Sequence, residues 1–296
     1  MNMAYSPCPN DTFIFHAWAH GLVPGAPELN VTYADIDITN SLAAKGEGPE
    51  VMKISYAALP WVLDDYALLP CGGALGRGCG PLVLTKQGGA GGGGGAIIEA
   101  SGAAQHEVYP LLAGQRVAVP SERSTAYLLF RLWAAQQLPG ESLEIVVMPF
   151  DQIMPAVRDG QVDAGLVIHE ARFTYANYGL QLLTDLGSWW ESDTGMPIPL
   201  GAIIARRSLD LEAITSWIRA SVHYAWEHPT ASQAYVMQHA QEMSPEVAEA
   251  HIDLYVNEFS AALGEEGYAA IEALLGRAAE AGLVPAFDLA KLRLQG

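Results

Sequence analysis

Short apolar runs alternate with helical patterns twice along this chain of 296 residues, and a glycine-rich segment separates the two series. The first series contains the runs NMAYSP, ELNVTYADI and VMKI, and the second contains QRVAVP, LEIVVMPF and AGLVI. Alternation of this kind predicts α/β architecture with mostly parallel sheets that are covered by helices on both faces. The helix in NDTFIFHAWAH is expected to be capped by Asn10 or Asp11. From Asp210 onward the pattern is helical alone, and Ser244-Pro245 predicts a capped helix start.

These runs predict two α/β lobes. Residues 1–86 and 203–296 are expected to form a larger, discontinuous lobe with the C-terminal helices, and residues 107–202 a smaller one. Between them, residues 87–106 offer almost no side chains for burial and are expected to form a mobile loop. Two lobes joined by two extended crossings describe a bilobed binding-protein architecture. A small-molecule ligand is therefore expected in the cleft between the lobes.

The composition argues against several partners. The net charge is −18, with 33 acidic and 15 basic residues and no basic stripe, so nucleic acid and anionic membranes are not expected to bind. The first residues carry no signal peptide, and no apolar run approaches the roughly 20 residues of a membrane span, which indicates a cytoplasmic protein. Cys8, Cys71 and Cys79 include no CxxC pair, so neither a disulfide framework nor a zinc thiolate site is expected.

The stretch VDAGLVIHEARFTY predicts a buried strand that stops at two titratable residues, His169 and Glu170. Ligands of α/β folds bind outside the carboxyl ends of strands, so His169 is predicted to face the cleft. The alternative is a structural histidine that is bonded to Glu170, to Arg172 or to a backbone group. The position at the end of a strand favours the functional interpretation.

Hydroxyl groups follow two other predicted strands. Ser55-Tyr56 come after VMKI, and Ser124 and Thr125 lie in the first turn of the helix after RVAVP. A hydroxyl beside the unpaired N–H groups of a helix start suits a carboxylate. Ordinary helix capping is the alternative at each position.

Three other motifs have both a functional and a structural interpretation. The run GGALGRGCG lacks the phosphate-loop pattern and precedes a strand, so it predicts either a close backbone approach to a ligand, with Arg77 nearby, or only a tight connection. His16 and His20 share one helix face as metal ligands do, but no third ligand is evident, and His20 also suits a helix C-terminus. Cys8 is either a nucleophile or a small residue buried in a turn.

Five ordered motifs resemble the 1,4-dihydroxy-6-naphthoate synthase family, which acts in the futalosine route to menaquinone. They are SPCPNDTFIFHA, KISYAAL, GGALGRGCGPLV, STAYLL and GLVIHEARFTYANYGL, and YVNEFS is similar as well. The resemblance implies a type II periplasmic-binding-protein-like fold used as a cytoplasmic enzyme. It further implies a lyase that splits cyclic dehypoxanthine futalosine into 1,4-dihydroxy-6-naphthoate and a three-carbon fragment, dihydroxyacetone, without a metal or an organic cofactor.

The resemblance also implies roles for residues. His169, in IHEARFTY where the family reads IHESRFTY, would be the catalytic base, a role that suits an imidazole near neutral pH. The motifs assign the polar end of the substrate to Ser55, Thr125 and Ser124, where the family often has Thr; Asn10 and Arg77 are further candidates for substrate contact. The glycine-rich segment is longer than the family pattern. A non-catalytic carboxylate-binding or sensor protein on the same fold remains the alternative, and the oligomeric state stays open.

Overall fold

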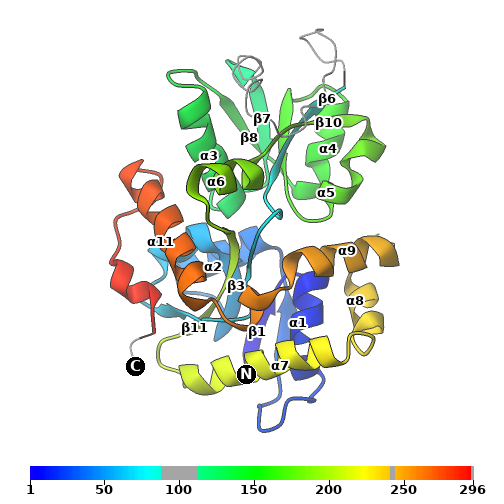
Figure 1. Ribbon diagram of the computed structural model, residues 1–296, viewed down its shortest axis with the longest axis vertical. Helices are drawn as coiled ribbons and strands as arrows, with labels where there is room; N and C mark the ends of the chain where they lie inside the picture. Colours follow the sequence, from blue (N-terminus) through cyan, green and yellow to red (C-terminus); the bar gives the residue numbers. More distant parts are fainter. Residues whose placement is uncertain (88–111, 241–243, 295–296) are drawn as a thin grey trace. The chain divides into compact units, whose positions relative to one another are not determined.

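The computed structural model describes residues 1–87, 112–240 and 244–294 (Figure 1). The predicted mobile loop lies outside the described residues from residue 88 on. Internal contacts divide the chain into two compact units. Unit 1 comprises Met1–Cys79, Arg123–Thr125 and Trp190–Gly296, and unit 2 comprises Gly80–Glu122 and Ala126–Trp189.

Each unit is built on one sheet. The strands of unit 1 lie in the order β2-β1-β3-β11-β4, with β5 also paired to β11, and those of unit 2 lie in the order β10-β6-β9-β7-β8. The unit 1 strands are β1 (Asn2–Tyr5), β2 (Asn30–Tyr33), β3 (Val51–Ser55), β4 (Tyr66–Leu68), β5 (Ala74–Gly76) and β11 (Ile198–Arg206). The unit 2 strands are β6 (Leu82–Lys86), β7 (Arg116–Val119), β8 (Glu144–Val147), β9 (Ala164–Val167) and β10 (Leu180–Asp185).

Helices surround both sheets, and no helix among the described residues is long and apolar enough to cross a membrane. Unit 1 contains α1 (Pro9–Ala19), α2 (Ile36–Lys45), η1 (Tyr56–Trp61), α7 (Leu211–Glu227), α8 (Gln233–His239), α9 (Pro245–Tyr255), α10 (Glu258–Ala261), α11 (Gly264–Glu280) and η5 (Leu289–Leu292). Unit 2 contains α4 (Phe150–Arg158), α5 (Ala171–Thr174) and η4 (Tyr175–Tyr178). Two helices cross the unit boundaries, α3 (Thr125–Gln137) and α6 (Leu186–Thr194).

The sheets are mixed, so the prediction of mostly parallel sheets was wrong. β1 pairs in parallel with β2 and β3, and β7 does so with β8 and β9. In contrast, β11 runs antiparallel to β3, β4 and β5, and β6 runs antiparallel to β9 and β10. An apolar run records burial but not strand direction, and β6 and β11 both adjoin the places where the chain passes from one unit to the other.

The unit boundaries also differ from the predicted lobe boundaries. Within the described residues β6 pairs only with strands of unit 2, and unit 2 begins at Gly80 rather than after the glycine-rich segment. The whole of β11 belongs to the sheet of unit 1, which resumes at Trp190 rather than at residue 203.

The core of unit 1 lies between its sheet and the group of α1, α7, α8 and α9 (Figure 1). Alternate strand residues such as Met3, Val51 and Ile203 point into this core, as the two-residue period of a strand requires. α1 packs against the other three helices as well as the sheet, and its residues from Pro9 to Trp18 are all buried. The predicted caps Asn10 and Asp11 lie inside α1, because Pro9 occupies the first helical position and the N-cap is Cys8, two residues before Asn10.

Unit 2 has a separate core, in which α4 packs against β9. A Cβ on Gly165 of β9 would lie 2.6 Å from Cγ2 of Ile153 and 2.8 Å from Cγ2 of Val157, so the helix and the strand approach too closely for any side chain there. Val167 and Ala171 belong to the same core, which anchors both sides of the segment that contains His169.

Three tyrosines and three histidines form a cluster at one end of the unit 1 sheet. The Tyr235 hydroxyl of α8 bonds to those of Tyr5 and Tyr33, and the His239 ring stacks on Tyr33 with 4.1 Å between ring centroids. The His16 and His20 rings lie 4.4 Å apart. This Tyr–His cluster joins four elements: β1, β2, α1 and α8.

We expect the Tyr–His cluster to make unfolding sensitive to acid. Burial, followed by the charge of His20, lowers the pKa of both His16 and His239. Histidines of the unfolded chain bind protons more readily, so stability is full above their pKa of about 6.5 and falls as the pH drops through it. Denaturation midpoints between about pH 8 and pH 5 should show this loss, and His239→Gln should reduce it.

The exposed His223 of α7 offers a control, since His223→Gln should keep the acid sensitivity of the wild type. Equal acid sensitivity in wild type and His239→Gln would contradict the prediction.

Candidate active site

Two parallel strands bring polar residues to one edge of the unit 1 sheet. β1 and β3 pair with Met3 opposite Val51, so their carboxyl ends lie together. The chain turns from β1 into α1 and from β3 into η1. Lys53 lies two residues after Val51 and therefore shares the face that α1 covers. The end of β3 thus meets the first turn of α1.

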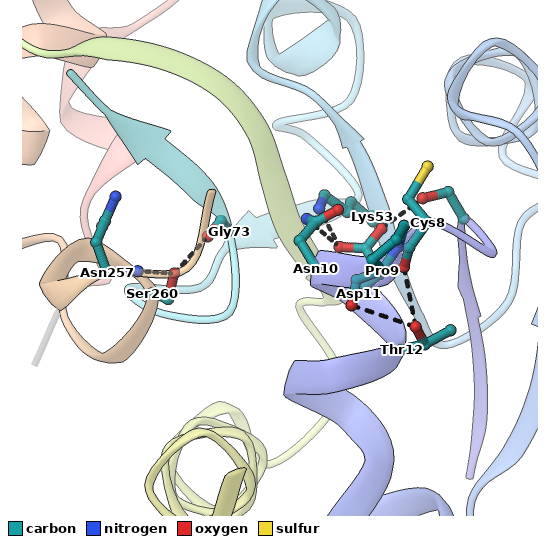
Figure 2. Close-up of polar contacts among 10 residues, drawn as sticks. Cys8, Pro9, Asn10, Asp11, Thr12, Lys53, Gly73, Asn257 and Ser260 are labelled. Carbon is teal, nitrogen blue, oxygen red and sulfur yellow. Dashed lines mark hydrogen bonds and ion pairs between the residues drawn. The ribbon is translucent and has the colours of Figure 1, made fainter. Parts of the chain in front are cut away.

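The Asp11 carboxylate lies at the centre of this polar group. It is 0 % exposed, and Lys53, only 5 % exposed, forms an ion pair with its Oδ1 (Figure 2). Ser6 Oγ donates to Oδ2 over 2.6 Å, and Asn10 Nδ2 donates to Oδ1 over 2.9 Å. Asn10, a predicted substrate contact, is 4 % exposed and hydrogen-bonded to Asp11. Its contact with a substrate stays a prediction.

Ser55, the last residue of β3, is held by Asn40 of α2. The Ser55 N–H donates to Asn40 Oδ1 over 2.8 Å, and Asn40 Nδ2 donates to Ser55 Oγ over 3.0 Å. The Ser55 side chain does not cap η1, so ordinary capping does not explain it. Within the described residues, the Ser55 hydroxyl accepts a hydrogen bond from Asn40 but has no acceptor for its own hydrogen.

Thr125 lies beside the same segment. Its Oγ1 donates to the Leu200 carbonyl over 2.9 Å and accepts from the N–H of Ala57, two residues after Ser55, over 3.2 Å. Ser124 is also buried, with 3 % exposure. The structure therefore brings Thr125 to the start of η1, next to Ser55, although the Thr125 proton already has an acceptor.

The glycines of GGALGRGCG permit close packing. A Cβ on Gly73 would lie 2.5 Å from the Gly201 carbonyl oxygen, and one on Gly76 would lie 2.6 Å from Nδ2 of Asn257. Ser260 Oγ donates to the Gly73 carbonyl, and Figure 2 shows this contact beside Asn257. The motif YVNEFS thus caps α10 and holds β5, which supports the tight-connection interpretation.

Arg77 lies at the surface of unit 1, with a side chain that is 48 % exposed. Its Nη2 donates to Glu266 Oε1 over 2.8 Å and to the Gly195 carbonyl over 3.1 Å. The structure therefore gives Arg77 an ion-pair role, and its contact with a substrate stays a prediction.

His169 lies in unit 2, two residues after β9 ends, and Glu170 leads into α5. Its φ of 54° makes it the one non-glycine residue with a positive φ in the described parts of the chain. The half-buried ring meets Phe150 edge-on, with 5.7 Å between centroids and an interplanar angle of 86°. A positive φ is uncommon in a non-glycine residue, and such outliers concentrate at functional sites.

Other candidate chemistries receive less support. Cys8, Cys71 and Cys79 form no disulfide within the described residues, and burial raises the pKa of the Cys71 thiol to about 12, which keeps it protonated near neutral pH. Among the residues that the structure describes, no group of three or more His, Cys, Asp or Glu is placed to hold a metal ion.

Sequence reasoning missed three residues of this site. Lys53 was detectable, because a charged residue inside the buried run VMKIS requires a partner. Asp11 was considered only as a helix cap, although it lies in the first turn of α1. No pattern marks Asn40, a buried amide on a short helix.

Comparison with known proteins identifies the relatives of this chain. A family model described as "Menaquinone biosynthesis" matches residues 1–280. The chain belongs to this family. This chain is 65% identical to 1,4-dihydroxy-6-naphthoate synthase of Streptomyces coelicolor over 289 residues, which cover 97% of this chain and 95% of the relative. It is 44% identical to the synthase of the same name from Thermus thermophilus over 286 residues, which cover 96% and 95%.

A solved structure shows the same fold. The periplasmic aliphatic sulphonate binding protein of Escherichia coli matches with a TM-score of 0.66 and 13% identity, over 100% of this chain and 92% of that one. The predicted periplasmic-binding-protein-like α/β fold is thereby confirmed, as is the predicted family. The curated relatives are enzymes, and this family member is an enzyme as well.

We expect removal of the Lys53 charge to destabilise the protein. Lys53→Met leaves Asp11 charged, buried and unpaired, so the free energy of unfolding should fall by about 3–5 kcal/mol. The double variant Lys53→Met/Asp11→Asn buries no charge and should recover most of this loss. Denaturant titration measures both variants.

The exposed pair between Lys291 and Asp64 is the matched control. Lys291→Met should change the unfolding free energy by less than about 1 kcal/mol. A Lys53→Met protein as stable as the wild type would show that the buried pair does not hold unit 1 together.

Proposed function

We propose that the chain cleaves cyclic dehypoxanthine futalosine to 1,4-dihydroxy-6-naphthoate and dihydroxyacetone, with His169 as the general base. The observation that carries the proposal is the 65% identity, over 97% of the chain, to a protein named 1,4-dihydroxy-6-naphthoate synthase. The left-handed backbone of His169 at the end of β9 supports its role.

The proposed reaction suits an imidazole. A base removes a proton from a carbon next to an electron sink, and the three-carbon unit then leaves so that the new ring becomes aromatic. Aromatisation provides much of the driving force. A positioned histidine can accept a proton near neutral pH, and general base catalysis usually contributes about 10²–10⁴ in rate.

We propose that the Ser55 hydroxyl donates a hydrogen bond to the substrate carboxylate. Asn40 donates to Ser55 Oγ and thereby orients the hydroxyl, and the residue is buried with 2 % exposure. Thr125 already donates its hydrogen bond to the Leu200 carbonyl, so its proposed part is to fix the start of η1 beside Ser55. Ser124 is included in the same carboxylate site.

We expect His169→Asn to abolish most turnover while the fold is kept. Asparagine adopts left-handed backbone readily, so the variant removes the base without adding strain. The rate of naphthoate formation from the cyclic futalosine, followed by absorbance, should fall by about 10²–10⁴. In the wild type, turnover should also fall as acid protonates the imidazole.

Product affinity should be the same in wild type and His169→Asn, and the exposed His223→Asn serves as a control that keeps full activity. Substantial activity in His169→Asn would exclude the base role. Binding of the cyclic futalosine by the wild type without any naphthoate formation would instead favour a carboxylate-binding or sensor protein.

We expect Ser55→Ala to affect mainly ligand affinity and Thr125→Val to affect mainly stability. Ser55→Ala removes a donor from the carboxylate and should weaken naphthoate binding by about 1–3 kcal/mol. Thr125→Val leaves the Ala57 N–H and the Leu200 carbonyl without their partner, so its main effect should be a loss of about 1–3 kcal/mol in stability. Calorimetric titration and denaturation measure the two effects.

Thr125→Ser keeps the hydroxyl and is the matched control. Unchanged naphthoate affinity in Ser55→Ala would show that the carboxylate site is wrongly placed.

A further inference from the structure

Arg172 of α5 joins three segments of unit 2. Its Nη1 donates to the Gly80 carbonyl over 2.8 Å, and its Nη2 pairs with Asp185 Oδ2 at 2.5 Å. Gly80 is the first residue of unit 2, Asp185 ends β10, and Arg172 follows His169 by three residues. The guanidinium therefore links the segment after His169 to both of the other segments.

The pair is shielded from water. The side chains of Arg172 and Asp185 are 20% and 13% exposed, and only the Asp11–Lys53 pair is less exposed among the ion pairs of the described residues. The two bonds leave Arg172 from different nitrogens of one rigid fork. A lysine has a single charged nitrogen and no such fork, so it does not reproduce the arrangement.

The two segments that Arg172 contacts are also packed against each other. Asp185 Oδ1 accepts from the N–H groups of Gly187 and Ser188 over 2.9 and 3.2 Å. A Cβ on Gly80 would lie 2.2 Å from the Gly187 nitrogen, and a Cβ on Gly187 would lie 2.7 Å from Cα of Gly80. Arg172 thus bonds to two segments of unit 2 that are closely packed against each other.

The backbone of His169 needs such an anchor. A left-handed non-glycine residue costs on the order of 1–3 kcal/mol and persists only where its surroundings fix it. Before His169, β9 is paired on both sides. After it, α5 has four residues, too few for a helix to be stable by itself. The N–H of Arg172 donates to the His169 carbonyl over 3.3 Å, so the anchored residue contacts the strained one directly.

We propose that Arg172 is a positioning residue for His169. By tying α5 to Gly80 and Asp185, it holds the turn in the geometry that directs the imidazole. The kinetic consequence rests on the proposed function, whereas the structural consequence does not. Small displacements of a catalytic group are enough to slow a reaction by about 10²-fold.

The test is Arg172→Lys, which keeps the charge and loses the fork. The expected result is a fall in kcat of about 10- to 100-fold, with KM and naphthoate affinity nearly unchanged. Asp185→Asn, which keeps an oxygen for Gly187 and Ser188, should reduce kcat in the same way. Because both changes break one contact, the double variant should be little worse than either single one.

Arg158→Lys is the matched control, since Arg158 forms an exposed pair with Asp159 on the same unit. It should leave kcat at the wild-type value. A reduced melting temperature with unchanged kcat in Arg172→Lys would overturn the proposal, because it is the result expected of a purely structural residue.

A second measurement separates this inference from the proposed function. The ring ¹⁵N signals of His169, assigned by their loss in His169→Asn, should shift in Arg172→Lys and stay in place in Arg158→Lys. An inactive wild type would refute the proposed function, and the signals would still report on positioning. Unshifted signals in a folded Arg172→Lys protein would refute the positioning role.

Discussion

A lysine inside a fully buried strand must meet an anion or lose its charge. Every residue of β3 is buried, and Lys53 is the charged one among them. Removing an ion from water costs several kcal/mol, so the carboxylate of Asp11 has to lie within reach, and this fixes how the first turn of α1 packs on the sheet. The same requirement extends to β11, where a Cβ on Gly201 would lie 2.7 Å from Cε of Lys53. One buried charge thus constrains three elements.

Unit 2 also contains a shielded ion pair, in which an arginine takes the place of the lysine. Arg172 and Asp185 form its most shielded ion pair among the described residues, and both members make further bonds to backbone groups. In unit 1 the shielded pair fixes a helix on a strand, whereas in unit 2 it fixes a short helix on two chain segments. Each pair lies within three residues of a proposed site residue: Lys53 lies two before Ser55, and Arg172 lies three after His169.

The sequence predicted which segments become strands and helices better than how they pair. Apolar period and turn residues gave the positions of β1, β3 and β9, and Ser244 caps α9 as expected. Strand direction and partner were not predictable, because β6 and β11 pair with strands from distant parts of the chain. The end of β9 shortly before His169 followed from the pattern, but the positive φ of His169 did not. The bond from Arg172 to Gly80 spans 92 positions, and no local signal marks it.

The two shielded pairs also bear on how an acidic chain can bind an anion. With 15 basic against 33 acidic residues, cations are scarce, and Lys53 and Arg172 are already neutralised by Asp11 and Asp185. A site near β3 therefore gains little attraction from its buried lysine. Hydroxyl and N–H donors provide a local alternative that needs no net charge, since a carboxylate accepts several such bonds. The Asn40–Ser55 arrangement, with its oriented hydroxyl, fits this requirement better than any ion pair among the described residues.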